Sequence, residues 1–338
     1  MRAFELIAGS NSLAGLRRCE RPDPKPQATQ ILVRLKAASL NYRDLMIARG
    51  HYMGGPVAAD TIPLSDGAGE IVAVGASVTR FRVGARVAGT FFRGWIDGAP
   101  PQGPLVALGV PPADGVLAEY AVFDEQDAVV APPHLSHEAA ATLPCAAVTA
   151  WRALADIGRI VPGDTVLLIG TGGVSIFALQ FARLAGARVL ILSSSDTKLE
   201  YARKLGAEGC VNYRTTPEWE GEVLKLTGGR GVDCVLEVGG AGTLGRSIAC
   251  LAVGGRIALI GVLTGPVAAG SPYGLLGKQA SVHGVFVGSR GQFERMNAAI
   301  ALHRLEPIID RVYDFDDAPA AYGHLQTAAH VGKVVLRI

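Results

Sequence analysis

The chain has 338 residues, more than one hydrophobic core usually supports, so we expect two domains. Hydrophobic residues make up 49% of it, charged residues 18%, and the net charge of +2 gives no electrostatic reason to bind nucleic acid or an anionic membrane. No apolar stretch is long enough to cross a bilayer and the first residues lack a signal-peptide layout, which predicts a cytoplasmic protein without membrane contact.

Short β-like runs separated by glycine, proline and aspartate fill the first third of the chain, at residues 31–37, 70–74, 85–89 and 118–123. They predict a compact, mostly antiparallel β unit. Residues 91–115 are rich in proline and glycine and predict a loop. Its aromatic residues Phe91, Phe92 and Trp95 could determine the shape of a substrate site or could be packing anchors.

Residues 165–183, TVLLIGTGGVSIFALQFAR, form the most informative stretch, because a β-like apolar run breaks into glycines and resumes with helical spacing. This pattern is typical of a dinucleotide phosphate cradle, in which glycines let the backbone approach a pyrophosphate at a helix N-terminus. We assign cofactor contacts to Gly170, Gly172, Gly173 and Val174, while Ser175 holds the third fingerprint position. The alternative is a strand-ending turn in an α/β domain that binds no nucleotide.

β-like and helix-like runs then alternate, at residues 188–192, 198–205, 209–212, 218–227, 232–238, 243–251, 256–262 and 282–287. Such alternation predicts a parallel sheet with crossover helices. We interpret residues 147–287 as a doubly wound dinucleotide-binding domain, with the last run as its sixth strand. Later runs at 293–305 and 317–328 favour helices, and a final β-like run, 333–338, could rejoin the amino-terminal unit.

The position that reads the cofactor ribose usually carries an acid for NAD and lacks one for NADP. Donors and positive charge without a competing carboxylate suit a 2′-phosphate. The residues expected there are Ser193, Ser194, Ser195, Lys198, Tyr213 and Arg214. Asp196 is expected to cap the next helix. NADPH is therefore favoured over NADH, although the two cations could be ordinary surface charges.

Six motifs in this order resemble the medium-chain dehydrogenase/reductases, in their zinc-independent, quinone-oxidoreductase-like branch. They are NYRDLMIARGHY, DGAGEIVAVG, LPCAAVTAWRAL, GTGGVSIFALQFA, LGA followed by NYR, and VGSR. The resemblance implies an α/β protein: a chaperonin-10-like β-rich catalytic domain, residues 1–146 completed by 288–338, and a Rossmann domain, 147–287. It also implies an active site in the cleft between them.

The zinc-dependent relatives bind their metal with a cysteine, a His-Glu pair and a second cysteine. By resemblance these positions hold Asn41, Ser65 with Asp66, and Cys145 in this chain. A lone thiolate does not make a zinc site, and residues 91–115 contain none of the cysteines of a structural zinc lobe. We therefore expect no zinc.

The resemblance also implies catalytic residues. Tyr52 resembles the active-site tyrosine of enoyl reductases and is assigned as a proton donor, the alternative being a packed loop tyrosine. Asn41 is expected to contact substrate or the nicotinamide ribose, and Tyr42 to line the same pocket. Asp44 is expected to brace the local helix.

On the cofactor side, Thr149 matches a threonine near the nicotinamide, and Val262 ends a strand-like run at the expected cofactor edge. Lys333 matches a pyrophosphate-binding cation, though it could equally pair with a carboxylate. Arg290 is expected to reach cofactor or substrate.

The leading hypothesis is hydride transfer from NADPH to a small-molecule acceptor, a quinone or an α,β-unsaturated carbonyl, without zinc. One alternative is an NAD(P)-dependent alcohol or aldehyde oxidoreductase, and another is a non-catalytic NADPH-binding protein. Residues 256–262 and the segment after them resemble the region through which the family pairs its nucleotide domains, so a homodimer is expected.

Overall fold

The computed structural model describes residues 1–52, 54–265 and 273–338, which divide into two compact units. Unit 1 comprises Met1–Val148 and Val287–Ile338, and unit 2 comprises Thr149–Phe286. These limits lie one or two residues from the expected domain boundaries, and the first division falls inside helix α3 (Val148–Arg152). No helix among the described residues combines the length and the hydropathy of a membrane span.

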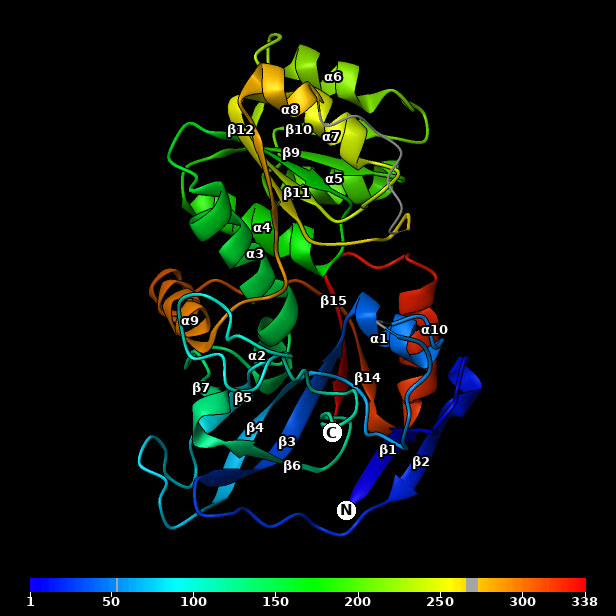
Figure 1. The fold of residues 1–338 in the computed structure, drawn as a ribbon, viewed down its shortest axis with the longest axis vertical. Helices are drawn as coiled ribbons and strands as arrows, with labels where there is room; N and C mark the ends of the chain where they lie inside the picture. The colour runs from blue at the N-terminus through cyan, green and yellow to red at the C-terminus, as the bar shows by residue number, and fades with distance from the viewer. Residues whose placement is uncertain (53, 266–272) are drawn as a thin grey trace. The chain divides into compact units, whose positions relative to one another are not determined.

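Unit 1 is built on a seven-stranded sheet that joins distant parts of the chain. Its strand order is β14-β15-β3-β4-β5-β7, β6 pairs with the other half of β3, and β1 and β2 form a separate hairpin. The strands are β1 (Arg2–Leu6), β2 (Leu16–Glu20), β3 (Gln30–Leu40), β4 (Asp66–Val74), β5 (Arg86–Gly89), β6 (Tyr120–Asp124), β7 (Ala128–Val130), β14 (Ile309–Asp314) and β15 (Lys333–Arg337). The expected return of the last strand is confirmed, because β15 pairs antiparallel with β3 (Figure 1).

The helices of unit 1 are short, apart from one of fourteen residues. They are α1 (Tyr42–Ala48), α2 (His137–Ala140), α9 (Arg290–His303) and α10 (Ala318–Gln326). The unit also contains a π-helical turn at Leu143–Ala147 and 3-10 turns at Leu13–Gly15, Glu125–Asp127 and Phe315–Asp317. Helix α10 packs against α1. One core, which includes Leu35, Leu40, Ile71 and Tyr322, joins the sheet to helices α1 and α10. Strands β3 and β4 pack so closely that a Cβ on Gly69 would meet the Arg34 carbonyl oxygen at 2.1 Å.

Unit 2 confirms the predicted doubly wound parallel sheet. Its order is β10-β9-β8-β11-β12-β13, with every neighbouring pair parallel. The strands are β8 (Thr165–Ile169), β9 (Arg188–Ser193), β10 (Gly209–Asn212), β11 (Val232–Glu237), β12 (Leu251–Leu259) and β13 (Ser281–Gly284). The helices are α4 (Gly173–Leu184), α5 (Asp196–Lys204), α6 (Trp219–Leu226), α7 (Leu244–Cys250) and α8 (Tyr273–Lys278), with a π-helical turn at Ala153–Gly158. All five residues of β8 are buried, as a central parallel strand requires.

Two strand ends differ from the prediction, for local reasons. Strand β12 ends at Leu259 because the next two N–H groups both bond to the Glu237 carbonyl and turn the chain. The sixth strand is β13, which is shorter than expected, and Val287 has a left-handed φ of +50°, outside the β region. Residues 266–272, part of the segment expected at a dimer interface, lie outside the described residues.

Candidate functional site

The glycine turn after β8 has the geometry of a phosphate cradle. Gly170 has φ +80°, Gly172 is the N-cap of α4, and a Cβ added to either would meet no atom within 4 Å. Open space over backbone at the start of a twelve-residue helix suits a pyrophosphate, because the first N–H groups of a helix have no partner within it. Ser175 holds the third fingerprint position, where its buried hydroxyl donates to the Ile169 carbonyl oxygen at 2.8 Å. Gly173 and Val174 begin the helix, half-buried.

The expected ribose site forms where β9 and β10 end side by side. The Tyr213 N–H donates to the Ser193 carbonyl oxygen at 3.0 Å, which joins the two strand ends. The side chains of Tyr213 and Arg214 are exposed, while Ser194, Ser195 and Lys198 are half-buried.

The prediction that Asp196 caps α5 is wrong. Ser195 is the N-cap, and its hydroxyl accepts from the Lys198 N–H at 3.5 Å. Asp196 is instead the first helical residue, and its carboxylate accepts a hydrogen bond of 2.8 Å from the Asn212 side chain. The carboxylate therefore lies at the strand ends that carry the expected ribose site.

Glu237, which was not among the residues predicted from the sequence, organises the loop after β11. Its side chain is fully buried, and Oε1 accepts from the N–H groups of Gly239 at 2.7 Å and Gly240 at 3.0 Å and from the Thr243 hydroxyl at 2.6 Å. Oε2 accepts from the Ser247 hydroxyl. An acid that ends an apolar strand just before a pair of glycines was the available signal. Since β8 and β11 are adjacent and parallel, this loop lies at the cradle edge of the sheet.

A second cluster of buried polar groups lies in unit 1, at the start of α1. Asp44 Oδ2 accepts from the Asn41 N–H at 2.7 Å, which confirms that Asp44 braces the helix. Arg43 lies 3.6 Å from Asp44 Oδ1 and donates to the Leu108 carbonyl oxygen at 3.0 Å. Its guanidinium carbon is 5.0 Å from the centre of the Tyr52 ring, within cation–π range.

Lys333 enters the same cluster from β15. Its Nζ lies 2.6 Å from the Leu40 carbonyl oxygen and 2.6 Å from Asn41 Oδ1, and the residue is only 3% exposed. The fully buried Asp66 accepts from the Ser65 hydroxyl at 2.7 Å and from the Cys145 N–H at 3.1 Å. The structure thus brings together Asn41, Ser65, Asp66 and Cys145, the four positions that the resemblance aligned with zinc ligands.

Burial dominates the electrostatics of this cluster. It raises the pKa of Asp44 from 3.8 to about 6, although the Arg43 guanidinium opposes the shift. Burial likewise raises the pKa of Asp66, against the Lys333 ammonium, and raises the pKa of the Cys145 thiol. The Cys145 thiol is therefore protonated at neutral pH.

The two predicted catalytic tyrosines have different surroundings. Burial raises the pKa of Tyr52 above 10, with Arg43 opposing, and its buried hydroxyl has no hydrogen bond of ordinary geometry with any described residue. Tyr42, the first residue of α1, is 45% exposed. The structure therefore places Tyr52, but not Tyr42, among the buried polar groups.

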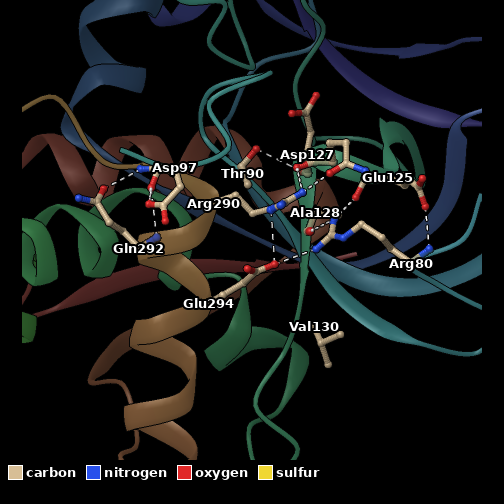
Figure 2. Close-up of polar contacts among 12 residues, drawn as sticks. Arg80, Thr90, Asp97, Glu125, Asp127, Ala128, Val130, Arg290, Gln292 and Glu294 are labelled. Atoms are coloured by element: carbon tan, nitrogen blue, oxygen red, sulfur yellow. Dashed lines mark hydrogen bonds and ion pairs between the residues drawn. The ribbon is translucent and has the colours of Figure 1, made fainter. Parts of the chain in front are cut away.

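The remaining predicted cofactor residues are spread over both units. In unit 2, Thr149 is buried in α3 and Val262, which follows β12, is 43% exposed. In unit 1, Arg290 begins α9 and contacts the Gln126 side chain. It also forms an ion pair with Glu294 (Figure 2). Glu294 bridges two cations, at 3.4 Å from Arg290 and 2.8 Å from Arg80. Arg290 thus belongs to a polar network that ties α9 to the turn before β7.

The aromatic residues of the loop 91–115 are packing anchors. Phe91, Phe92 and Trp95 are each at most 2% exposed. The two phenylalanine rings pack edge to face with centroids 4.6 Å apart, and the Arg43 guanidinium carbon lies 4.7 Å from the centre of the Phe91 ring. These contacts place the loop against the buried cluster.

The residues of this site do not fit a zinc ion. Among the described residues no group of three or more His, Cys, Asp or Glu side chains could hold a metal. A catalytic zinc needs three protein ligands, whereas the aligned positions offer one carboxylate, one thiol and an amide whose oxygen is already bonded to Lys333.

Two family models match this chain. Residues 27–133 match the alcohol dehydrogenase GroES-like domain, which confirms the predicted chaperonin-10-like fold, and residues 173–302 match the zinc-binding dehydrogenase model. A zinc-type alcohol dehydrogenase-like protein of Schizosaccharomyces pombe is 46% identical over 91% of both chains.

Solved structures of similar proteins support the same family assignment. A structure described as an NAD-dependent alcohol dehydrogenase is 32% identical with a TM-score of 0.91, and a mycobacterial protein in complex with NADPH is 27% identical with a TM-score of 0.84. Each covers the whole of both chains. The predicted resemblance is confirmed: this chain belongs to the medium-chain dehydrogenase/reductase superfamily and is an NAD(P)-dependent oxidoreductase of its alcohol dehydrogenase-like kind.

Proposed function

We propose that this protein is a zinc-independent reductase that adds hydride from NADPH to a quinone or an α,β-unsaturated carbonyl. The observation that carries the proposal is the buried cluster of unit 1, where an ammonium is bonded to the amide oxygen of Asn41. That contact leaves the amide nitrogen of Asn41, with its two donors, for the Asp66 carboxylate, whose pKa the Asn41 side chain helps to lower against burial, and for a bound acceptor. A donor of this kind can bind a carbonyl oxygen, whereas oxidation of an alcohol usually needs a Lewis acid to acidify it.

NADPH, when bound, supplies the hydride. For an enone, hydride adds to the β-carbon and a proton to the α-carbon, so both electrons and both hydrogens are accounted for, with NADP⁺ as the other product. Asn41 Nδ2 would donate to the carbonyl oxygen as enolate charge develops. Tyr52 would deliver the proton, because its raised pKa keeps the phenol protonated at neutral pH and Arg43 stands beside its ring to stabilise the phenolate.

NADPH is proposed over NADH from the composition of the ribose site. Two serine hydroxyls, Lys198 and Arg214 supply donors and positive charge at the ends of β9 and β10. The mycobacterial relative was solved with NADPH. Asp196 supports the second candidate, NAD-dependent alcohol oxidation, because its carboxylate lies at the same strand ends and another relative is named as NAD-dependent.

The cofactor proposal is tested by fluorescence titration with NADPH and NADH. Lys198→Ala is expected to weaken NADPH binding about tenfold and to leave NADH unchanged, since one charge-assisted contact is worth roughly 1.4 kcal/mol. Lys204→Ala, at the exposed end of the same helix, is the matched control. Tighter binding of NADH by the unaltered protein would overturn the choice of cofactor and support the alcohol-oxidising alternative.

The reaction is tested by NADPH oxidation with a panel of enones, quinones and, in the reverse direction, primary alcohols with NAD⁺. We expect saturable reduction of at least one activated acceptor, unchanged after dialysis against a chelator. Tyr52→Phe should lower kcat for enones about 100-fold or more, while Tyr120→Phe, whose hydroxyl accepts a hydrogen bond from Arg34 at the surface, should not. Unchanged enone turnover in Tyr52→Phe would remove that residue from the mechanism. Tight NADPH binding with no turnover of any acceptor would favour a non-catalytic binding protein.

A further inference from the structure

Lys333 is a cation enclosed by oxygen atoms in the interior of unit 1. Its Nζ lies 2.6 Å from each of two acceptors, the Leu40 carbonyl oxygen and Asn41 Oδ1, which come from the end of β3 and the residue after it. The residue is 3% exposed, so water contributes little to its solvation. An ammonium without acceptors would be costly at this depth, and the two short contacts meet that need.

The charges packed around Lys333 balance. Asp44 and Asp66 are both buried, and the Lys333 ammonium lowers the pKa of each against the effect of burial. The second cation is Arg43, 3.6 Å from Asp44. Among the described residues of this cluster, two cations thus face two acidic side chains, and Cys145, Tyr52 and Tyr322 are the other titratable side chains that interact with them.

We propose that the Lys333 ammonium takes the place of a metal ion as the permanent cation of this site and acts as a positioning residue for Asn41. An ammonium has three donors and no acceptor, so it can bind only the oxygen of the amide. The contact therefore fixes which end of Asn41 is available as a donor, and this part of the inference rests on the proposed function. It also disfavours zinc, since a divalent ion added to a balanced cluster would leave two buried positive charges without partners.

The experiment compares Lys333→Ala with and without added n-propylammonium chloride, which restores the three carbons and the ammonium that the substitution removes. We expect Lys333→Ala to lower Tm by roughly 5–10 °C, because it leaves a buried carboxylate without its cation. Millimolar propylammonium should recover at least half of that loss, and the same concentration of 1-propanol should not. Equal recovery with 1-propanol would show that Lys333 only fills volume and would overturn the proposal.

Two further variants keep the test decisive if Lys333→Ala does not fold. Lys333→Arg, which retains charge and donors, should keep Tm within about 3 °C of the unaltered protein, while Lys333→Met, which retains length, should not. Arg337→Met is the matched control on β15, because that side chain is 60% exposed in an ion pair with Glu138. Similar Tm values for Lys333→Arg and Lys333→Met would contradict a charge-based role.

The positioning role is read from enone reduction. Lys333→Ala should lower kcat at least about tenfold while KM changes by less than about threefold, and propylammonium should restore kcat in parallel with Tm. Recovery of Tm without recovery of kcat would overturn the positioning of Asn41. If the unaltered protein reduces no acceptor, the proposed function fails, but the Tm series still decides whether Lys333 is the cation of the site.

Discussion

The buried carboxylate of Glu237 offers the sharpest test of how unit 2 holds its cofactor edge. Four donors converge on it, and three of them, the N–H groups of Gly239 and Gly240 and the Thr243 hydroxyl, bond to the same oxygen, Oε1. We consider Glu237→Gln, which keeps an oxygen at the Oε1 position and removes the charge. The amide nitrogen would then face Ser247, whose hydroxyl can reverse and accept.

The magnitude follows from the difference between charged and neutral hydrogen bonds. A bond to a charged group contributes about 1.5–3 kcal/mol and a neutral one about 0.5–1.5 kcal/mol, so three weakened contacts lose about 3 kcal/mol. Burying a neutral side chain costs less than burying a charged one, which offsets part of this loss of hydrogen-bond energy. We therefore expect the free energy of unfolding to fall by about 2 kcal/mol. Glu237→Leu, which leaves two backbone N–H groups without acceptors, should cost at least about 4 kcal/mol.

The assay is urea unfolding followed by circular dichroism, with NADPH titration of the folded variants. Because the loop after β11 adjoins the cradle, NADPH affinity should fall about tenfold in Glu237→Gln. Glu222→Gln, which removes a surface pair with Lys225, is the control and should change stability by less than about 0.5 kcal/mol. If Glu237→Gln and Glu237→Leu are as stable as the control, the carboxylate does not organise this loop and the reasoning is refuted.

Three further predictions concern other sites. The pKa of Asp44, raised to about 6, means that the folded state favours the protonated acid, so its contribution to stability should fall by about 2.4 kcal/mol between pH 4 and pH 7. The difference in unfolding free energy between the unaltered protein and Asp44→Asn, measured across that range, should fall by the same amount, and a constant difference would contradict the shift. Gly172→Ala, whose Cβ would enter open space, should keep Tm within about 3 °C of the unaltered protein but lower its NADPH affinity at least about tenfold in fluorescence titration. An unchanged NADPH affinity would show that the pyrophosphate binds elsewhere. Sedimentation at micromolar concentration should show a homodimer, and a stable monomer would contradict the expectation for residues 256–262 and the segment after them.

The elements of unit 2 could be predicted because their signals are local. An apolar run, a glycine turn and a resumed helical spacing lie within 19 residues, and the parallel sheet follows from simple alternation. Element ends were harder to predict. The N-cap of α5 is Ser195 and not Asp196, whose carboxylate instead accepts a hydrogen bond from Asn212 at the end of a neighbouring strand.

The buried cluster of unit 1 could be only partly predicted. The resemblance supplied Asn41 and Tyr52, but the contact of Asn41 with Lys333 joins residues 292 positions apart and leaves no local pattern. Glu237 was missed for a different reason: an acid at a strand end is usually solvated, and its burial depends on four donors from the following loop and helix. Long-range polar contacts of this kind depend on tertiary packing.

The place of β15 in its sheet has a consequence for biosynthesis. This strand lies between β14 and β3, yet it is translated after the whole of unit 2. The ribosome therefore releases a complete parallel sheet while the sheet of unit 1 still lacks an inner strand. Since domains fold as units during synthesis, unit 2 should mature first and β3 should wait with an exposed edge, a state that chaperones recognise. A stalled chain that ends before residue 333 would then be protease-resistant in unit 2 alone.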